Sequence, residues 1–241
     1  MDVKQLRPGL WRWTAAHPEW KPEKDKPGGW GQMVGCVLYE PGAGAEPSGV
    51  VLIDPLAPPE GSPEAAGFWE ALDRDVRRRA LPVSILLGNH YHERSAARIL
   101  ERYRERPGAS IWAHESMRGK VRCPITDTFT RDGSVLPGGI RAHRVAGMED
   151  NEAAFHIPAH GALTFSDALI GAGAGRVRVA PLSWAPDTPE AARAYESEFR
   201  ASLRRLLDLP IEMLLVSHGP PILEGGRAAL EEALAAPAWG E

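Results

Sequence analysis

Short apolar runs alternate with longer helix-like segments along this chain, and this rhythm restricts the fold more than any other feature. The runs 33–40 (MVGCVLYE), 49–56 (GVVLIDPL) and 82–88 (PVSILLG) are rich in β-branched or aliphatic residues and are bounded by Gly or Pro, which is typical of strands. Residues 62–80 begin with Ser-Pro, carry acidic residues early and end on arginines, as a helix dipole favours. The succession of strand, helix and strand indicates an α/β layer.

The rest of the chain also alternates strand-like and helix-like segments, and its middle part is richer in strand-like ones. Residues 95–106 read as a helix and 110–115 (SIWAHE) as a strand, whereas the stretch from 135 to 165 looks rich in β-structure. Residues 189–209 form the clearest amphipathic helix, and 211–219 (IEMLLVSHG) form a last apolar strand. The sequence therefore predicts a chain of mixed helix and strand.

Length and composition exclude several classes of protein. A chain of 241 residues is long enough for one large domain, which we expect to span residues 1–241. A net charge of -4 provides no basic surface for nucleic acid, so no nucleic-acid partner is expected. No segment is apolar enough to cross a membrane, and the beginning of the chain lacks the apolar core of a signal peptide. With only Cys36 and Cys123 present, a reducing compartment is the simpler assumption, and we expect a cytoplasmic protein.

Two histidines follow the strand at 82–88 with one residue between them. In an extended segment, residues i and i+2 point to the same side, so His90 and His92 would direct both imidazoles at one point while Tyr91 faces away. This spacing suits a metal ion, although a His-x-His pair on its own is equally consistent with a solvated loop. The motif becomes informative only beside the other strand ends.

Polar residues follow two further apolar strands in the same way. His218 comes directly after residues 211–217, and Asp167 comes just past the apolar run 162–165. Three strand ends that each deliver an imidazole or a carboxylate are what the active-site edge of an α/β protein supplies. Their alternative roles are structural, since His218 precedes Gly-Pro-Pro and could close a turn.

The order of these motifs resembles that of the metallo-β-lactamase fold superfamily over most of the chain. VLIDP resembles the family's strand that ends in an acidic residue, here Asp54, and NHYHERS resembles its His-x-His-x-Asp-His signature. ALTFSDALIG and LLVSHGPPI resemble the segments with its bridging aspartate and final histidine, so His90, His92, Asp167 and His218 match. The resemblance implies an α+β fold, an αββα sandwich of two facing mixed sheets with helices on the outer faces.

The same comparison shows where the chain departs from the family. Arg94 stands at the position of the family's aspartate and Ser95 at that of its histidine, and these two would normally build the second metal site. The family's middle histidine would fall near Gly147, where the chain has Met148 and then Glu149. A guanidinium near a divalent ion would repel it by roughly twice the ~4 kcal/mol of two unit charges about 4 Å apart. We therefore expect at most one ion per chain.

One ion would need a substitute for the missing histidine. Glu149, Asp150 and Asp167 are the candidates that would complete the three protein ligands of a catalytic zinc. A set of two histidines and one carboxylate suits zinc and also iron or manganese. The predicted metal ligands are therefore drawn from His90, His92, Asp167, His218 and Glu149.

Two hypotheses of function follow. In the first, the protein is a mononuclear metal-dependent hydrolase of a small ester, thioester or phosphoester, with Asp167 and Arg94 as catalytic residues. In the second, it binds no metal: Arg94 pairs with Asp167 in place of the second ion, and the protein binds a small anion or a protein partner without catalysis. We expect a structural or surface role for the remaining histidines of the middle segment, His114, His143, His156 and His160. The tryptophan-rich loop 17–31 either covers the core or overhangs a pocket.

Overall fold

The computed structural model describes residues 1–25, 29–42, 49–79, 82–148 and 152–237. Its larger sheet has seven strands, which lie side by side in chain order. These are β1 (Asp2–Arg7), β2 (Leu10–Ala16), β3 (Met33–Tyr39), β4 (Val50–Ile53), β5 (Val83–Leu86), β6 (Ser110–His114) and β7 (Asp127–Phe129). Strands β1 to β4 pair antiparallel, whereas β4 to β7 pair parallel. The carboxyl ends of β4 and β5 therefore meet at one edge of the sheet.

A second sheet of five strands faces the first, in the order β14, β11, β10, β9, β8. Its members are β8 (Ser134–Val135), β9 (Arg141–Arg144), β10 (Ala153–Ile157), β11 (Ala162–Phe165) and β14 (Met213–Val216). Only β11 and β14 pair parallel, so their carboxyl ends also lie together. A separate antiparallel ribbon joins β12 (Leu169–Gly173) to β13 (Arg176–Val179).

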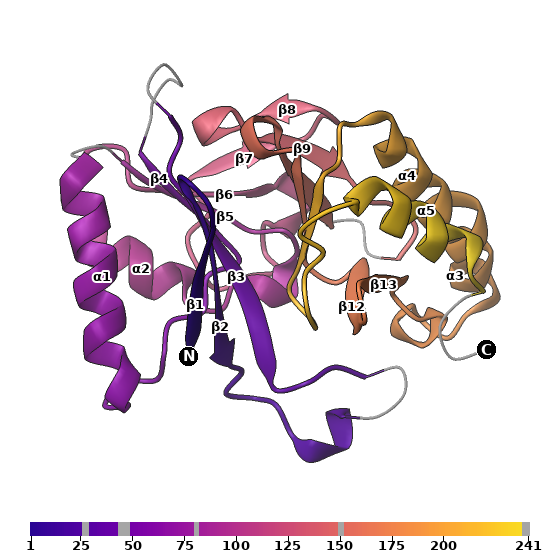
Figure 1. Ribbon diagram of the computed structural model, residues 1–241, viewed down its shortest axis with the longest axis horizontal. Helices are drawn as coiled ribbons and strands as arrows, with labels where there is room; N and C mark the ends of the chain where they lie inside the picture. The colour runs from indigo at the N-terminus through magenta and orange to yellow at the C-terminus, as the bar shows by residue number, and fades with distance from the viewer. Residues whose placement is uncertain (26–28, 43–48, 80–81, 149–151, 238–241) are drawn as a thin grey trace.

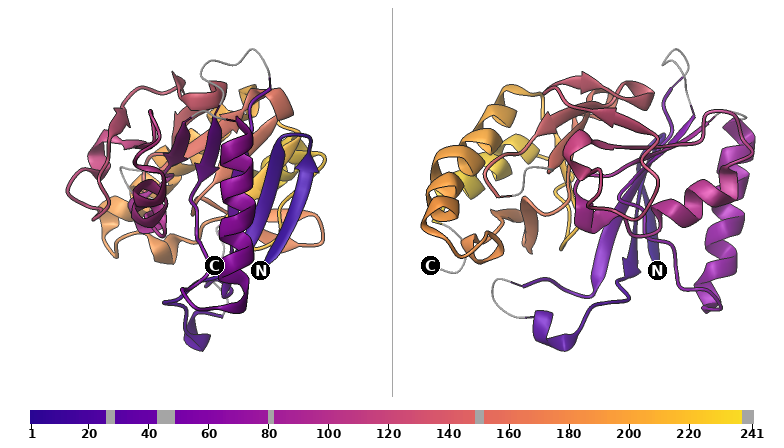
Figure 2. Two further views of the ribbon diagram at one scale, coloured as in Figure 1. Left: turned by 90° about the vertical axis from the view of Figure 1, so that its left-hand side faces the viewer. Right: turned by 180° about the vertical axis from the view of Figure 1, so that it is seen from behind.

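Helices cover the outer faces of the two sheets. The helices are α1 (Pro63–Arg79), α2 (Ala96–Tyr103), α3 (Pro189–Ala194), α4 (Arg200–Arg205) and α5 (Gly226–Ala235). In Figure 1, α1 and α2 lie beside the seven-stranded sheet, and α3, α4 and α5 lie on the far side of the second sheet. The view from behind in Figure 2 shows both sheets between these two helical layers. The expected αββα sandwich, an α+β fold with two facing mixed sheets, is confirmed.

The alternation of side chains along each strand explains the layers. In β4, Val51 and Ile53 face the second sheet and pack in one cluster with Phe155 of β10. Val50 and Leu52 face the other way and pack with the apolar side chains of α1 and α2. Because successive side chains of a strand point to opposite faces, a strand buried on both sides must be apolar throughout. This requirement is why the sequence shows continuous apolar runs instead of alternating ones.

The second sheet follows the same rule. Met213 and Leu215 of β14 point into the space between the sheets. Leu214 and Val216 point outward, where they pack in a cluster with Leu203 of α4 and the apolar face of α5. Three apolar layers therefore hold the four structural layers together.

Two features of the fold differ from the sequence-based expectation. The amphipathic segment 189–209 is helical almost throughout, as expected, but its middle turn is a π turn at Tyr195–Phe199 between α3 and α4, and the rings of Tyr195 and Phe199 are buried. The N-terminal hairpin of β1 and β2 was not predicted, because the strand alternation there is obscured by charged residues on an exposed edge. None of the described helices is both long and apolar enough to cross a bilayer.

Candidate metal centre

The candidate site lies where four strands of the two sheets end. Asp54 follows β4, residues 88–92 follow β5, Asp167 follows β11, and His218 follows β14. The two sheets meet here through a bridge between Val34 and His218. Residues that are far apart in the chain are brought together because parallel neighbours end at the same edge.

Asp54 is the buried anchor of the site. One carboxylate oxygen, Oδ1, accepts the N–H of Gly88 at 2.8 Å. The other, Oδ2, accepts the hydroxyl of Ser166 at 2.6 Å and lies 2.8 Å from Nδ1 of His92. Gly88 is required at its position, since a Cβ there would come within 1.9 Å of the Ser166 hydroxyl oxygen. Asp54 therefore fixes both the turn after β5 and the orientation of one imidazole.

His90 and His92 do not point at the same place. Residues His90–His92 form a 3₁₀ turn instead of an extended segment, and the side chain of Asn89 caps this turn by accepting the N–H of Tyr91 at 2.9 Å. With about three residues per turn, positions i and i+2 lie on different sides of the chain. His92 points into the site, whereas His90 is half-buried and lies against Tyr91, with ring centroids 3.8 Å apart. The expected convergence of the His-x-His pair is thus not observed.

Asp167 joins the two imidazoles that do converge. Its Oδ1 lies 3.2 Å from Nε2 of His92 and 3.0 Å from Nε2 of His218. Candidate ligand atoms of these three residues all lie within 4.8 Å of one another. The remaining candidates from the sequence, Glu149 and Asp150, lie outside the described residues. Of the predicted ligands, the structure therefore brings together His92, Asp167 and His218.

The position of His92 between two carboxylates sets the charges of the site. Burial and the Arg94 guanidinium oppose its protonation, but Asp167 and Asp54 outweigh them and raise the pKa of His92 to about 9. Burial would raise the pKa of Asp167, yet His92 and His218 hold that pKa well below its ordinary value. Burial lowers the pKa of His218 in spite of its contact with Asp167. Without a metal, an imidazolium flanked by two carboxylates is the stable state at neutral pH.

Asn89 and Glu152 support Asp167 from behind, and the sequence analysis did not identify either of them. Asn89 donates from Nδ2 to Oδ2 of Asp167 at 2.7 Å and to Oε2 of Glu152 at 3.0 Å. The other oxygen of Glu152 accepts the backbone N–H groups of Asp167 at 2.9 Å and of Ala168 at 2.8 Å. Burial and the neighbouring Asp167 raise the pKa of Glu152 to about 7. The available signal was the position of Glu152 directly before the apolar run 153–155.

Arg94 has different partners from the expected ones. Its Nη1 donates to the carbonyl oxygen of Asp54 at 2.9 Å and approaches that of Gly35 at 3.3 Å, so the guanidinium binds the backbone just after β4 and within β3. Its Nη2 lies 3.3 Å from Nε2 of His92. Within the described part of the chain it makes no ion pair with Asp167, whose partners are His92, His218 and Asn89. The proposed Arg94–Asp167 pair is corrected accordingly: the backbone carbonyls of Asp54 and Gly35 hold the guanidinium instead.

Backbone strain is concentrated at this site. Three described residues other than glycine have positive φ, and two of them are Asp54 at 48° and Arg94 at 34°. Such conformations cost of order 1–3 kcal/mol each and persist where the surroundings fix them, often at functional sites. The strain places the Asp54 carboxylate and the Arg94 guanidinium on either side of His92.

The donor atoms fit one metal ion. Ligands 2.0–2.1 Å from a tetrahedral zinc lie about 3.3 Å from one another, which is close to the 3.2 and 3.0 Å between the Asp167 oxygen and the two imidazole nitrogens. Asp54 holds Nδ1 of His92 and leaves Nε2 directed at the site, as a supporting carboxylate does for many zinc-bound histidines. A second ion has no comparable donor group among the described residues, and Arg94 adds a positive charge beside the first.

Comparison with known proteins identifies the architecture. No family model and no curated protein matches the sequence. The structure, however, matches a metallo-beta-lactamase family protein from Thermus thermophilus with a TM-score of 0.59, at 23% identity over 96% of this chain and 80% of that one. It also matches a metallo-beta-lactamase from Pontibacter korlensis with a TM-score of 0.61, at 16% identity over 98% of this chain and 99% of that one. This chain has the metallo-β-lactamase fold.

A third match is a beta-lactamase domain protein from Burkholderia ambifaria, with a TM-score of 0.60 at 18% identity over 97% of this chain and 76% of that one. Identities this low establish the metallo-β-lactamase fold and no more. The chemistry of this chain has to be argued from its own side chains.

Above the three donors of this metallo-β-lactamase fold lies a pocket of about 380 Å³. Its floor contains His92, Asp167 and His218, and its wall includes Trp30 and Trp184. The ring of Trp30 lies 4.9 Å from that of His218, centroid to centroid. Of the two roles considered for the tryptophan-rich loop, Trp30 has both, since it lines this pocket and also packs against the apolar cluster between the seven-stranded sheet and helices α1 and α2.

Glu152→Ala is expected to weaken zinc binding by about 10- to 100-fold, as loss of a supporting residue behind a ligand does. The substitution removes the acceptor of the Asp167 and Ala168 N–H groups and releases Asn89, so the Asp167 carboxylate loses its orientation. Competition with a zinc-sensitive dye measures the affinity. Glu212→Ala is the control, because it removes an exposed carboxylate in the loop before β14. Equal affinities for the Glu152 variant and the unsubstituted chain would contradict the supporting role.

Proposed function

We propose that this protein is a mononuclear metal-dependent hydrolase whose ion is held by His92, Asp167 and His218. The observation that carries the proposal is the convergence of two imidazole nitrogens and one carboxylate oxygen at the joined strand ends. Two histidines and a carboxylate are an adequate set for a catalytic zinc, and also for iron or manganese. We propose zinc as the resident ion, with one ion per chain.

The residues around the three donors have separable roles in this proposal. A bound ion would supply Lewis-acid chemistry, polarising a carbonyl or phosphoryl oxygen and making a water more acidic. Asp54 orients His92, and Asn89 orients Asp167. Arg94 lines the same pocket and would stabilise negative charge that develops on the substrate. Its guanidinium is already fixed by the backbone carbonyls of Asp54 and Gly35, so it need not reorganise during the reaction.

The pocket supports a small substrate. A volume of about 380 Å³ with an aromatic wall suits a small ester, thioester or phosphoester, and these are the substrate classes that we propose. Cys36 and Cys123 are buried and unpaired, which supports our further proposal of a reducing, cytoplasmic location.

Elemental analysis of protein purified without chelator or affinity tag tests the proposal directly. We expect close to one zinc, iron or manganese ion per chain, and hydrolysis of a small aryl ester or aryl phosphate that stops when a chelator is added. Two ions per chain would contradict a mononuclear centre. No ion even after addition of zinc or manganese would overturn the hydrolase and favour the second candidate.

The second candidate is a binding protein without catalysis. One observation favours it: Nη2 of Arg94 lies 3.3 Å from Nε2 of His92, the nitrogen that would bind an ion. In that case the imidazolium and the carboxylates form a buried scaffold, and Arg94 binds a small anion or an acidic group of a protein partner. The metal content distinguishes the two candidates.

A further inference from the structure

A second pocket opens beside the metal centre, at the start of helix α2. This α2 pocket has a volume of about 550 Å³ and adjoins the first, since both are lined by His17, Glu19, Tyr91 and Arg94. Arg94 therefore stands at the boundary between the two. A ligand longer than the first pocket would extend past Arg94 into the α2 pocket.

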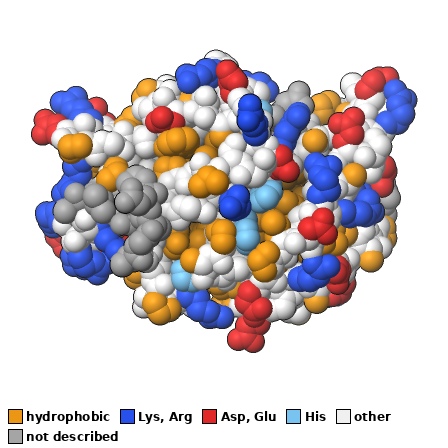
Figure 3. Space-filling model, turned by 90° about the horizontal axis from the view of Figure 1, so that it is seen from above, with side chains coloured by type: hydrophobic (Ala, Val, Ile, Leu, Met, Phe, Trp, Pro, Cys, Tyr) orange, Lys and Arg blue, Asp and Glu red, His pale blue; other side chains and the backbone are white. Residues whose placement is uncertain are grey.

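The lining of the α2 pocket is predominantly basic. Four cationic side chains line it, which are Arg94, Arg98, Lys120 and Arg122, against two carboxylates, Glu19 and Glu93. On the face of the molecule drawn in Figure 3, by comparison, basic and acidic side chains are interspersed. A chain with a net charge of -4 thus gathers positive charge next to the proposed reaction site.

Much of the opposing negative charge is already engaged. Glu93 accepts the backbone N–H groups of Arg122 at 2.6 Å and Cys123 at 3.1 Å, and it also pairs with the Arg122 guanidinium at 3.1 Å. Lys120 is exposed and has no ion-pair partner among the residues that the structure describes. Its charge is therefore available to a ligand.

Arg98 is held in place by contacts that leave its charge largely uncompensated. Its guanidinium lies 4.8 Å above the ring of Trp69 and approaches the carbonyl oxygen of Pro58 at 3.3 Å. Its one carboxylate contact is with Glu60 at 3.5 Å, and that side chain is 82% exposed. An exposed pair of this kind contributes little, so the cation remains attractive to an anion. Stacking on the ring also orders the guanidinium before a ligand arrives.

We propose that the α2 pocket binds an oxyanion group of the substrate, a phosphate or a carboxylate, while the scissile ester, thioester or phosphoester lies over the metal centre. The inference rests on the proposed hydrolase function and specifies its substrate as a molecule with a charged end. Guanidinium groups recognise phosphate and carboxylate through paired N–H donors, and a lysine adds a point charge.

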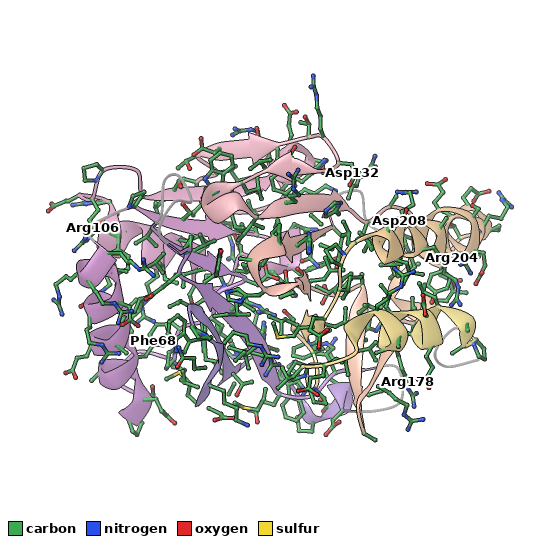
Figure 4. All side chains as sticks on the ribbon, turned by 45° about the horizontal axis from the view of Figure 1, so that its top comes forward. Phe68, Arg106, Asp132, Arg178, Arg204 and Asp208 are labelled. Carbon is green, nitrogen blue, oxygen red and sulfur yellow. The ribbon has the colours of Figure 1, made fainter. Side chains whose placement is uncertain are left out.

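Calorimetric titration of the full chain, as purified, with inorganic phosphate and separately with succinate tests this inference at constant ionic strength. We expect saturable binding of at least one of the two anions, and the tighter one identifies the oxyanion. Lys120→Gln and Arg98→Gln are each expected to weaken that binding by about tenfold or more, as loss of a charged hydrogen bond does. Arg204→Gln is the matched control: it removes the same charge from α4, in the helical layer across the sandwich (Figure 4), and should leave the affinity unchanged.

The outcomes separate this inference from the proposed function. Absence of saturable binding of both anions overturns the α2 pocket as an oxyanion site, even if the protein contains zinc and hydrolyses esters. Equal weakening by Lys120→Gln and Arg204→Gln also overturns it, since the effect would then be one of general charge. Binding that depends on Lys120 and persists in His218→Ala supports the pocket independently of the metal. If such binding is found and the metal is absent, the hydrolase fails and the anion pocket stands.

Discussion

His218→Ala is expected to abolish zinc binding at micromolar zinc while the chain remains folded. His218 supplies one of the three donors, and the two that remain fall short of the three protein ligands of a catalytic zinc. Because Nδ1 of His218 has no hydrogen-bond partner among the described residues, the substitution removes no contact other than those with Asp167 and the surrounding rings. Elemental analysis after dialysis against zinc measures the loss, and circular dichroism checks the fold.

His90→Ala is the decisive companion to this experiment. The spacing of the His-x-His motif predicts that His90 is a ligand, whereas the structure turns its imidazole away from the three donors. We therefore expect His90→Ala to keep its zinc. Loss of zinc in His90→Ala, together with retention in His218→Ala, would show that the turn after β5 rearranges around the ion.

The second large effect concerns stability. Asp54→Ala is expected to lower the free energy of unfolding by about 3–5 kcal/mol in the metal-free state, because it leaves the buried His92 imidazolium without one of its two carboxylates. His92→Ala should have a comparable effect. The double substitution should cost much less than the sum, since both single changes break the same pair.

Urea unfolding of the unsubstituted chain, the two single variants and the double variant, each with a chelator present, gives the double-mutant cycle for this pair. A control cycle on Glu190 and Arg193, an exposed pair 2.8 Å apart on α3, should show a coupling below about 1 kcal/mol. Additive effects of Asp54→Ala and His92→Ala would contradict the buried pair. Asp54→Asn keeps an acceptor for Gly88 and so separates the loss of charge from the loss of that hydrogen bond.

The protonation of His92 also makes the free energy of unfolding of the metal-free chain depend on pH. The pKa of His92 is raised to about 9 in the folded chain, from about 6.5 for an unperturbed histidine. The folded state therefore holds the proton more tightly, so the stabilisation is complete below about pH 6.5 and is lost as the pH rises through about 9. His92→Gln should flatten this part of the stability profile.

The layered fold was predictable from the sequence because its information is local. The runs 49–56 and 211–217 are apolar at nearly every position, and that pattern is required of strands buried on both faces. The order of strands and helices then restricts the connections to a few arrangements. The π turn between α3 and α4 was not predictable, since it depends on how Tyr195 and Phe199 pack against the second sheet.

At the site, the sequence by itself determined that Asp54, Asp167 and His218 follow buried strands. Parallel strands then bring such residues to one edge whatever the details of packing. Only the tertiary structure decided the rest: that His92 and not His90 joins the group of donors, that Glu152 supports Asp167, and that Arg94 binds backbone carbonyls. Each of these depends on contacts between residues far apart in the chain. A buried polar group must find some partner, but which partner it finds is set by the packing of the two sheets and cannot be read from neighbours in the sequence.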